Sequence, residues 1–224
     1  MAVPIRHSVV SNDVTFALGE AIEQELRQRL LSKLKSSTGD ELSKMPVHEL
    51  LVIHGNWKYR LPPPRPRVVH KASEFAATVP AADESDVDEL VESIERGDDL
   101  TPHLSTLVES QYVPVADRKR GPRRDLDLML STWGVHHFHL SKAPGPRQFN
   151  ERTGDLLFGV VRPDDAYLIG IYNHKSWPDQ DIVRILWRNW PNEGLVLGLV
   201  GQPATQLTDK DVESTRKAGV NTAV

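Results

Sequence analysis

The sequence predicts an α+β fold, with a helical N-terminal part and a small C-terminal antiparallel sheet flanked by helices. Apolar residues four positions apart run from Leu18 to Leu34, which is the stripe of an amphipathic helix. Two apolar segments, 155–161 and 166–172, are separated by Arg-Pro-Asp-Asp and predict a hairpin. A third segment, 133–140, alternates in polarity like a strand. Strands joined as hairpins favour antiparallel pairing over wound α/β units.

The N-terminal part begins with a predicted helix over 17–35 and a second short helix over 39–44. The apolar run 49–54 is short enough to be a buried strand or a turn of helix, and its length does not decide between them. Prolines at 62, 63, 64 and 66 forbid a central strand and favour an extended segment. Residues 68 and 69 are then expected to form an edge strand.

The middle of the chain changes from strongly acidic to strongly basic. Residues 83–99 carry nine acidic side chains and one arginine, with apolar residues at helical spacing, and predict an acidic amphipathic helix. A second helix is expected after Thr101-Pro102, which suit a cap and the first helical position. Residues 117–124 hold five cations around a Gly-Pro break. We therefore expect a helical region over 1–116 with a basic extended segment, a basic linker over 117–124, and an α+β domain over 125–224 that carries the activity.

Within the C-terminal part, further elements accompany the hairpin. A short helix is expected over 125–130, and another begins near Pro178 with its apolar residues on one face. Residues 195–200 are expected to add a strand. A last helix begins after Thr208, which is expected to cap it together with Asp211.

Composition narrows the possible chemistry of the 224-residue chain. It contains no cysteine, which excludes disulfides, thiolate zinc sites and cysteine nucleophiles. The net charge is -4, so any site for a polyanion has to be a local patch. The sequence lacks a signal-peptide pattern and an apolar run of roughly 20 residues, which predicts a cytoplasmic protein that does not enter a membrane. P-loop, dinucleotide-binding and zincin motifs are absent as well.

A histidine cluster at 136, 137 and 139 is the densest chemical signal. Side chains alternate along a strand, so His137 and His139 are expected on one open face, roughly 6.5–7 Å apart, and His136 on the core face. Such a pair can divide acid and base duties between two imidazoles. The alternative is that both are partly buried polar residues satisfied by their neighbours.

The ends of the hairpin strands carry further candidates. Arg152 precedes the first strand, while His174 and Lys175 follow the second, so all three can converge on the face of His137 and His139. These groups suit RNA cleavage without a metal. One histidine would take the proton of the 2′-hydroxyl, another would protonate the 5′-oxygen, and Lys175 and Arg152 would hold the phosphate. An ordinary polar turn at 174–175 is the alternative.

Two other functions fit the same side chains. His137, His139 and His174 can ligate a divalent metal such as zinc, with Asp155 or Asp179 completing the site, which would make the chain a metalloenzyme. Otherwise no cofactor is expected. A non-catalytic interaction protein, in which the histidines are structural, is the other alternative.

A basic segment is the candidate for substrate binding. Arg65, Arg67, His70 and Lys71 can line one edge of the extended chain, and Trp57 and Tyr59 are available for base stacking. This pattern fits RNA or an acidic protein partner. A solvated edge, protected from aggregation by proline and arginine, is the alternative.

Several motifs together resemble a family of uncharacterised bacterial proteins over most of the chain: Trp133-Gly-Val-His-His-Phe-His-Leu-Ser, Asp99-Leu-Thr-Pro-His-Leu-Ser, Pro63-Pro-Arg-Pro-Arg-Val-Val-His and Asn189-Trp-Pro. Residues 125–200 more weakly resemble RelE/ParE-type toxins, with a comparable hairpin and with Arg152, His174 and Lys175 at comparable places. That resemblance implies an endoribonuclease of a toxin–antitoxin pair, or a toxin that acts by binding a cellular protein, with an antitoxin as partner. The chain departs from these toxins in its greater length and its His-x-His strand.

Overall fold

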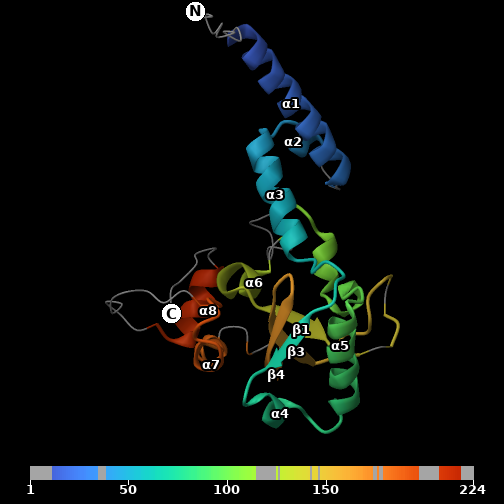
Figure 1. The fold of residues 1–224 in the computed structure, drawn as a ribbon, viewed down its shortest axis with the longest axis vertical. Coiled ribbons are helices and arrows are strands. Elements are labelled where there is room, and N and C mark those ends of the chain that lie inside the picture. Colours follow the sequence, from blue (N-terminus) through green and yellow to red (C-terminus); the bar gives the residue numbers. More distant parts are fainter. Residues whose placement is uncertain are drawn as a thin grey trace, which may run out of the picture.

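A computed structural model shows an α+β protein with N-terminal helices and a four-stranded mixed sheet flanked by helices (Figure 1). It describes residues 12–34, 39–114, 125, 127–141, 143–145, 147–173, 176, 179–196 and 207–217. The helices are α1 (Asn12–Lys33), α2 (Gly39–Ser43), α3 (Val47–Tyr59), α4 (Phe75–Thr78), α5 (Glu84–Arg96), α6 (Leu128–Trp133), α7 (Asp181–Asn189) and α8 (Asp209–Lys217). The strands are β1 (Val68–Lys71), β2 (His136–His139), β3 (Asp155–Val161) and β4 (Asp165–Asn173).

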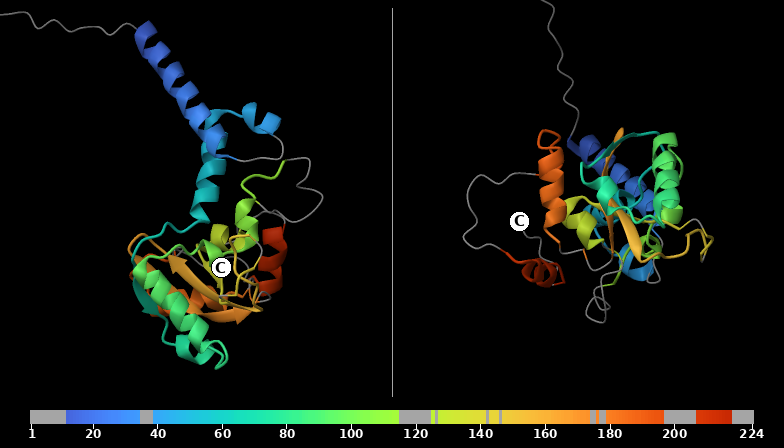
Figure 2. Two further views of the ribbon diagram at one scale, coloured as in Figure 1. Left: turned by 90° about the vertical axis from the view of Figure 1, so that its right-hand side faces the viewer. Right: turned by 90° about the horizontal axis from the view of Figure 1, so that it is seen from below.

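The N-terminal helices have a small core of their own. The second half of α1 packs on α3, and Leu30 and Leu34 belong to the same buried apolar cluster as Leu50. Arg27 of α1 donates hydrogen bonds to the main-chain oxygens of Ser43 and Met45, which attaches α1 to the turn after α2. The first half of α1 extends away from the rest of the molecule (Figures 1 and 2).

The sheet has the order β1-β4-β3-β2. β3 pairs antiparallel with both β2 and β4, so the predicted hairpin is confirmed. β1 pairs with β4 in parallel, which makes the sheet mixed rather than purely antiparallel as expected. Because the chain between β1 and β4 is long, it can cross over the sheet and return in the same direction, which a tight turn cannot do.

Helices cover both faces of the sheet. Figures 1 and 2 show α5 and α7 on opposite sides of it. Residues 156–160 of β3 and 166–171 of β4 are consequently all buried. This explains why these strands are continuous apolar runs without alternation.

Most of the predicted elements are present. The run 49–54 lies inside helix α3, which decides between the two alternatives for it. β1 is an edge strand that follows the proline-rich segment, as expected. The expected helix after Thr101 is instead two 3-10 turns, Thr101–His103 and Thr106–Glu109. At α8, Thr208 and Asp211 exchange the expected capping hydrogen bonds.

Some expectations concern parts of the chain that the structure does not describe. The basic linker 117–124 lies entirely outside the described residues, as do 197–200 of the expected strand over 195–200. The proposed domain boundaries remain a prediction, although β1, from the expected N-terminal region, contributes an edge to the C-terminal sheet. Among the described residues, no helix is long and apolar enough to cross a membrane.

Candidate functional site

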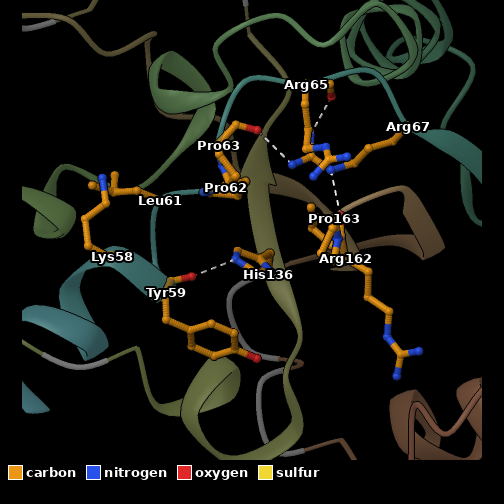
Figure 3. Close-up of a pocket in the computed structure, with 11 residues that line it drawn as sticks. Lys58, Tyr59, Leu61, Pro62, Pro63, Arg65, Arg67, His136, Arg162 and Pro163 are labelled. Atoms are coloured by element: carbon orange, nitrogen blue, oxygen red, sulfur yellow. Dashed lines mark hydrogen bonds between the residues drawn. The ribbon is translucent and has the colours of Figure 1, made fainter.

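A pocket of about 320 Å³ lies where the end of α3, the proline-rich segment, β2 and the β3–β4 turn meet (Figure 3). Cations from three separate segments line it. They are Lys58 from α3, Arg65 and Arg67 from the proline-rich segment, and Arg162 from the turn. His136 of β2 is a further lining residue. The pocket therefore has a basic rim around one imidazole.

Arg67 holds the wall of the pocket together. Its guanidinium donates hydrogen bonds to three main-chain oxygens, those of Arg162, Arg65 and Pro63. Only 5% of the residue is exposed, and burial is the main reason why the pKa of Arg67 is lowered. The proline-rich segment is therefore fastened to the β3–β4 turn by the same residue that contributes charge to the pocket.

The other two arginines differ in the partners that their side chains already have. Arg162 donates to the main-chain oxygens of Glu193 and Gly194, and Figure 3 shows its side chain directed away from the other cations. Arg65 forms an ion pair with Asp164, and its side chain is 46% exposed. An exposed pair of this kind is weak, so Arg65 can exchange its partner for a ligand.

Lys58 and Tyr59 end helix α3 at the opposite side of the pocket. Both are exposed, and Lys58 Nζ lies 5.4 Å from the ring centroid of Trp57. Tyr59, at 55% exposure, presents an aromatic ring beside the cations. Pro62 and Pro63 add apolar surface between Tyr59 and Arg67 (Figure 3). The pocket thus combines positive charge with aromatic and apolar surface.

His136 is the buried polar group of the site. Its Nε2 lies 3.4 Å from the main-chain oxygen of Tyr59, and its Nδ1 has no hydrogen-bond partner. Burial lowers the pKa of the His136 imidazole to about 4, so the ring is neutral near pH 7. When Nε2–H donates to Tyr59, Nδ1 carries a lone pair that can accept a hydrogen bond.

The two histidines expected on an open face are buried. His137 is 6% exposed and His139 is 2% exposed, so the alternation expected along β2 does not separate an open face from a core face. The reason is that both faces of β2 are covered. Asp127, before α6, lies over His137, with Oδ2 3.3 Å from Nδ1, and His103 Nδ1 lies 2.8 Å from the main-chain oxygen of His139.

The remaining predicted residues lie elsewhere. Arg152 is exposed and donates hydrogen bonds to the hydroxyl groups of Ser105 and Thr106. His174 and Lys175 are outside the described residues. The expected convergence of Arg152 with His137 and His139 is therefore not a feature of the described site, and the chemical roles of all these side chains remain predictions.

The predicted binding residues divide into two groups. The pocket brings Arg65 and Arg67 together, as expected for a phosphate site. Trp57 and Lys71 are not among its lining residues. The indole nitrogen of Trp57 donates to the main-chain oxygen of Val108, and Lys71 Nζ lies 5.3 Å from the ring centroid of Phe75.

Tyr59, expected as a stacking residue, lines the pocket, whereas Lys58, His136 and Arg162 are not predicted as site residues. Tyr59 closes α3, His136 opens β2 and Arg162 follows β3, so each lies at the end of an element, where the fold brings it to the pocket. His136 is expected on the core face, and the structure buries it. Because it lies at the start of β2, this core-facing side chain also lines the pocket.

The histidine cluster is also the candidate metal site expected from the sequence. Within the part of the chain that the structure describes, no three histidine, aspartate or glutamate side chains come close enough to hold a metal ion. His174, the third ligand expected from the sequence, is outside that part. Of the expected ligands, His137 has a carboxylate beside it among the described residues, that of Asp127.

Comparisons with protein-family models, curated proteins and solved structures find no match for the chain. The function has to be argued from the geometry of the site.

Proposed function

We propose that this chain binds single-stranded RNA through the pocket at His136. The observation that carries the proposal is that Lys58, Arg65 and Arg67 line one pocket together with a buried imidazole that has an unused acceptor. The sequence-based prediction of an RNA-directed protein is consistent with this arrangement.

The cations supply the attraction to phosphate. Lys58 and Arg65 are the exposed cations. To bind a phosphate, Arg65 has only to exchange its partner Asp164 for a phosphate oxygen. Arg67 is fixed by its three main-chain partners, so its positive charge is present before a ligand arrives. A charge held in place in this way needs no reorganisation to stabilise a bound anion.

His136 supplies a means of selecting RNA over DNA. A neutral imidazole whose Nδ1 accepts a hydrogen bond suits a hydroxyl donor, and the ribose 2′-hydroxyl is the donor that DNA lacks. The exposed ring of Tyr59 offers a surface on which a base can stack. Phosphate, ribose and base therefore each have a suitable group at this pocket.

Binding can be measured by fluorescence anisotropy with single-stranded RNA and with DNA of the same sequence. We expect the wild type to bind RNA more tightly, with an affinity that falls as salt concentration rises. Lys58→Ala and Arg65→Ala should each weaken binding and reduce the salt slope by about one unit. Arg184→Ala is the matched control, because Arg184 is an exposed arginine paired with one aspartate, as Arg65 is.

The same measurements show whether the pocket prefers RNA to DNA and whether its arginine matters. Equal affinity for RNA and DNA would remove the role of His136, and loss of binding in Arg184→Ala to the same extent as in Arg65→Ala would remove the role of the pocket. If none of the variants changes binding, the proposal is wrong.

RNA cleavage is a second proposal, favoured by the pair of Asp127 and His137. A carboxylate 3.3 Å from an imidazole nitrogen is the arrangement that orients a histidine for proton transfer. His137→Ala and His139→Ala, produced at equal folded yield, should then leave RNA intact where the wild type produces fragments. Fragmentation of RNA by both variants would remove these histidines from the cleavage, and intact RNA with the wild type would leave binding alone as the function.

A further inference from the structure

The two arginines of the proline-rich segment hold their positive charges close together in the pocket at His136. Burial is the main reason for the lowered pKa of Arg67, and the charge of Arg65 lowers it further. Figure 3 shows both side chains reaching the same end of the pocket. Two guanidinium groups that disfavour each other are relieved by an anion that binds both of them.

Arg67 keeps donors for such an anion. A guanidinium has five N–H groups. The three printed bonds of Arg67 use Nε–H, one hydrogen of Nη1 and one hydrogen of Nη2, for the main-chain oxygens of Arg162, Arg65 and Pro63. The second hydrogens of Nη1 and Nη2 carry none of these bonds. Arg67 can therefore hold the wall of the pocket and donate to a ligand at the same time.

The pocket has room for about one nucleotide. Its volume of about 320 Å³ is at the lower end of the range in which proteins enclose small molecules, about 300 to 1,000 Å³. Leu61 and Val161 line it and are half-buried side chains that pack against the core of the sheet. A strand that ran through the molecule at this point would have to cross that core, so a ligand enters and leaves on the outer side.

Acidic groups border Arg65 on two sides. The main chain of Gly97, at the end of the acidic helix α5, packs against the peptide bond after Arg65, because an added Cβ would lie 2.3 Å from its carbon and nitrogen atoms. The next two residues, Asp98 and Asp99, are exposed. On the β3–β4 turn, Asp164 pairs with Arg65. A row of phosphates that continued past Arg65 would meet these negative charges.

We propose that the pocket holds the terminal phosphomonoester of an RNA strand, at its 5′ or its 3′ end, and not a phosphodiester within the strand. This inference rests on the proposed binding of single-stranded RNA. A phosphomonoester carries about −1.5 to −2 charges near pH 7 and three acceptor oxygens, whereas a phosphodiester carries about one negative charge. Lys58, Arg65 and Arg67 together match the larger charge. The rest of the strand leaves on the side of Lys58 and Tyr59, away from α5.

Three RNA ligands with equal numbers of phosphates test the inference by fluorescence anisotropy with the full chain. Two are strands of one length with a 5′-phosphate or a 3′-phosphate. The third has hydroxyl groups at both ends and is one nucleotide longer, so all of its phosphates are phosphodiesters. We expect one of the phosphorylated strands to bind at least about tenfold more tightly than the hydroxyl-ended strand, and its identity tells which end the pocket holds.

Arg65→Ala should reduce this preference to about threefold or less, because it removes the exposed guanidinium at the phosphate. Arg184→Ala is the matched control and should keep the full preference, since Arg184 is an exposed arginine with one aspartate partner outside the pocket. A preference that is undiminished in Arg65→Ala would place the terminal phosphate elsewhere and overturn the inference.

The other outcomes separate this inference from the proposed function. Equal affinity for the three ligands would overturn terminal recognition and leave the binding of single-stranded RNA in place. A free nucleoside monophosphate that binds as tightly as the phosphorylated strand would assign the pocket to small nucleotides, which also overturns the inference. If the wild type binds none of the three strands, the proposed function itself is wrong.

Discussion

His136 Nε2 and the main-chain oxygen of Tyr59 lie 3.4 Å apart, and this contact joins the first residue of β2 to the last residue of α3. It connects the N-terminal helices with the sheet at the point where the pocket forms. The same contact occupies Nε2 and leaves the buried Nδ1 as the nitrogen of His136 without a hydrogen-bond partner.

The burial of His136 predicts a loss of stability in acid. The pKa is about 4 in the folded protein and 6.5 for an ordinary histidine, so the unfolded chain takes up the proton first. The free energy of unfolding should therefore fall as the pH is lowered from about 6.5 to about 4, by about 3 kcal/mol in total from this group. His136→Gln cannot be protonated, so its urea-unfolding free energy should fall less than that of the wild type between about pH 7 and about pH 4.5. Equal losses in the two proteins would contradict the prediction.

Arg67 and Arg65 should differ sharply in their effect on stability. Arg67→Met leaves three main-chain oxygens without their donor in a buried place, which should cost about 2–4 kcal/mol of unfolding free energy. Arg65→Ala removes only an exposed ion pair and should cost at most about 1 kcal/mol. Urea denaturation measures both. Similar values for the two variants would show that the main-chain contacts of Arg67 do not stabilise the fold.

Gly97 is expected to tolerate no side chain. Its φ of +83° lies in the left-handed region, and an added Cβ would collide with the main chain of Arg65 and Pro66. Gly97→Ala should therefore lower the unfolding free energy by more than about 2 kcal/mol. Gly134 is the control, because it has a φ of +70° but only the Tyr59 hydroxyl, 3.5 Å away, near the added atom. Gly134→Ala should cost about 1 kcal/mol, and a larger loss there than at Gly97 would refute the role of the close contact.

Asp127 has two functions that substitutions can separate. Its side chain accepts hydrogen bonds from the main-chain nitrogens of Met129 and Leu130 at the start of α6, and its other oxygen lies beside His137. Asp127→Ala should lose the cap at a cost of about 1 kcal/mol, while Asp127→Asn should keep most of it. Thermal unfolding of both variants distinguishes them. A loss as large in Asp127→Asn as in Asp127→Ala would assign the stabilising effect to the charge beside His137 instead.

Local sequence patterns predicted the helices and strands well, because these elements depend on residues that are close together in the sequence. The hairpin follows from two apolar runs and a short turn, and β1 follows from the prolines that keep residues 68–71 at an edge. The parallel pairing of β1 with β4 could not be predicted in this way. Paired residues such as Val68 and Asp165 are 97 residues apart, and no pattern within either segment specifies the other.

The site was harder to predict for the same reason. Arg65 and Arg67 were identified because they stand together in the sequence. Lys58, His136 and Arg162 come from segments that only the folded chain brings to one place. The burial of His137 and His139 depends on α6 and on the turns after Thr101, which cover a strand whose own alternation indicates one open face.

The parallel position of β1 has a consequence for the order of folding. During synthesis, the N-terminal helices and α5 are complete long before β4 exists, so β1 has no partner until residues near 168 have left the ribosome. The prolines just before β1 discourage a wrong partner during that interval. We therefore expect the β3–β4 hairpin to form first and β1 to join it late, which makes closure of the sheet's β1 edge the slow step in the folding of this chain.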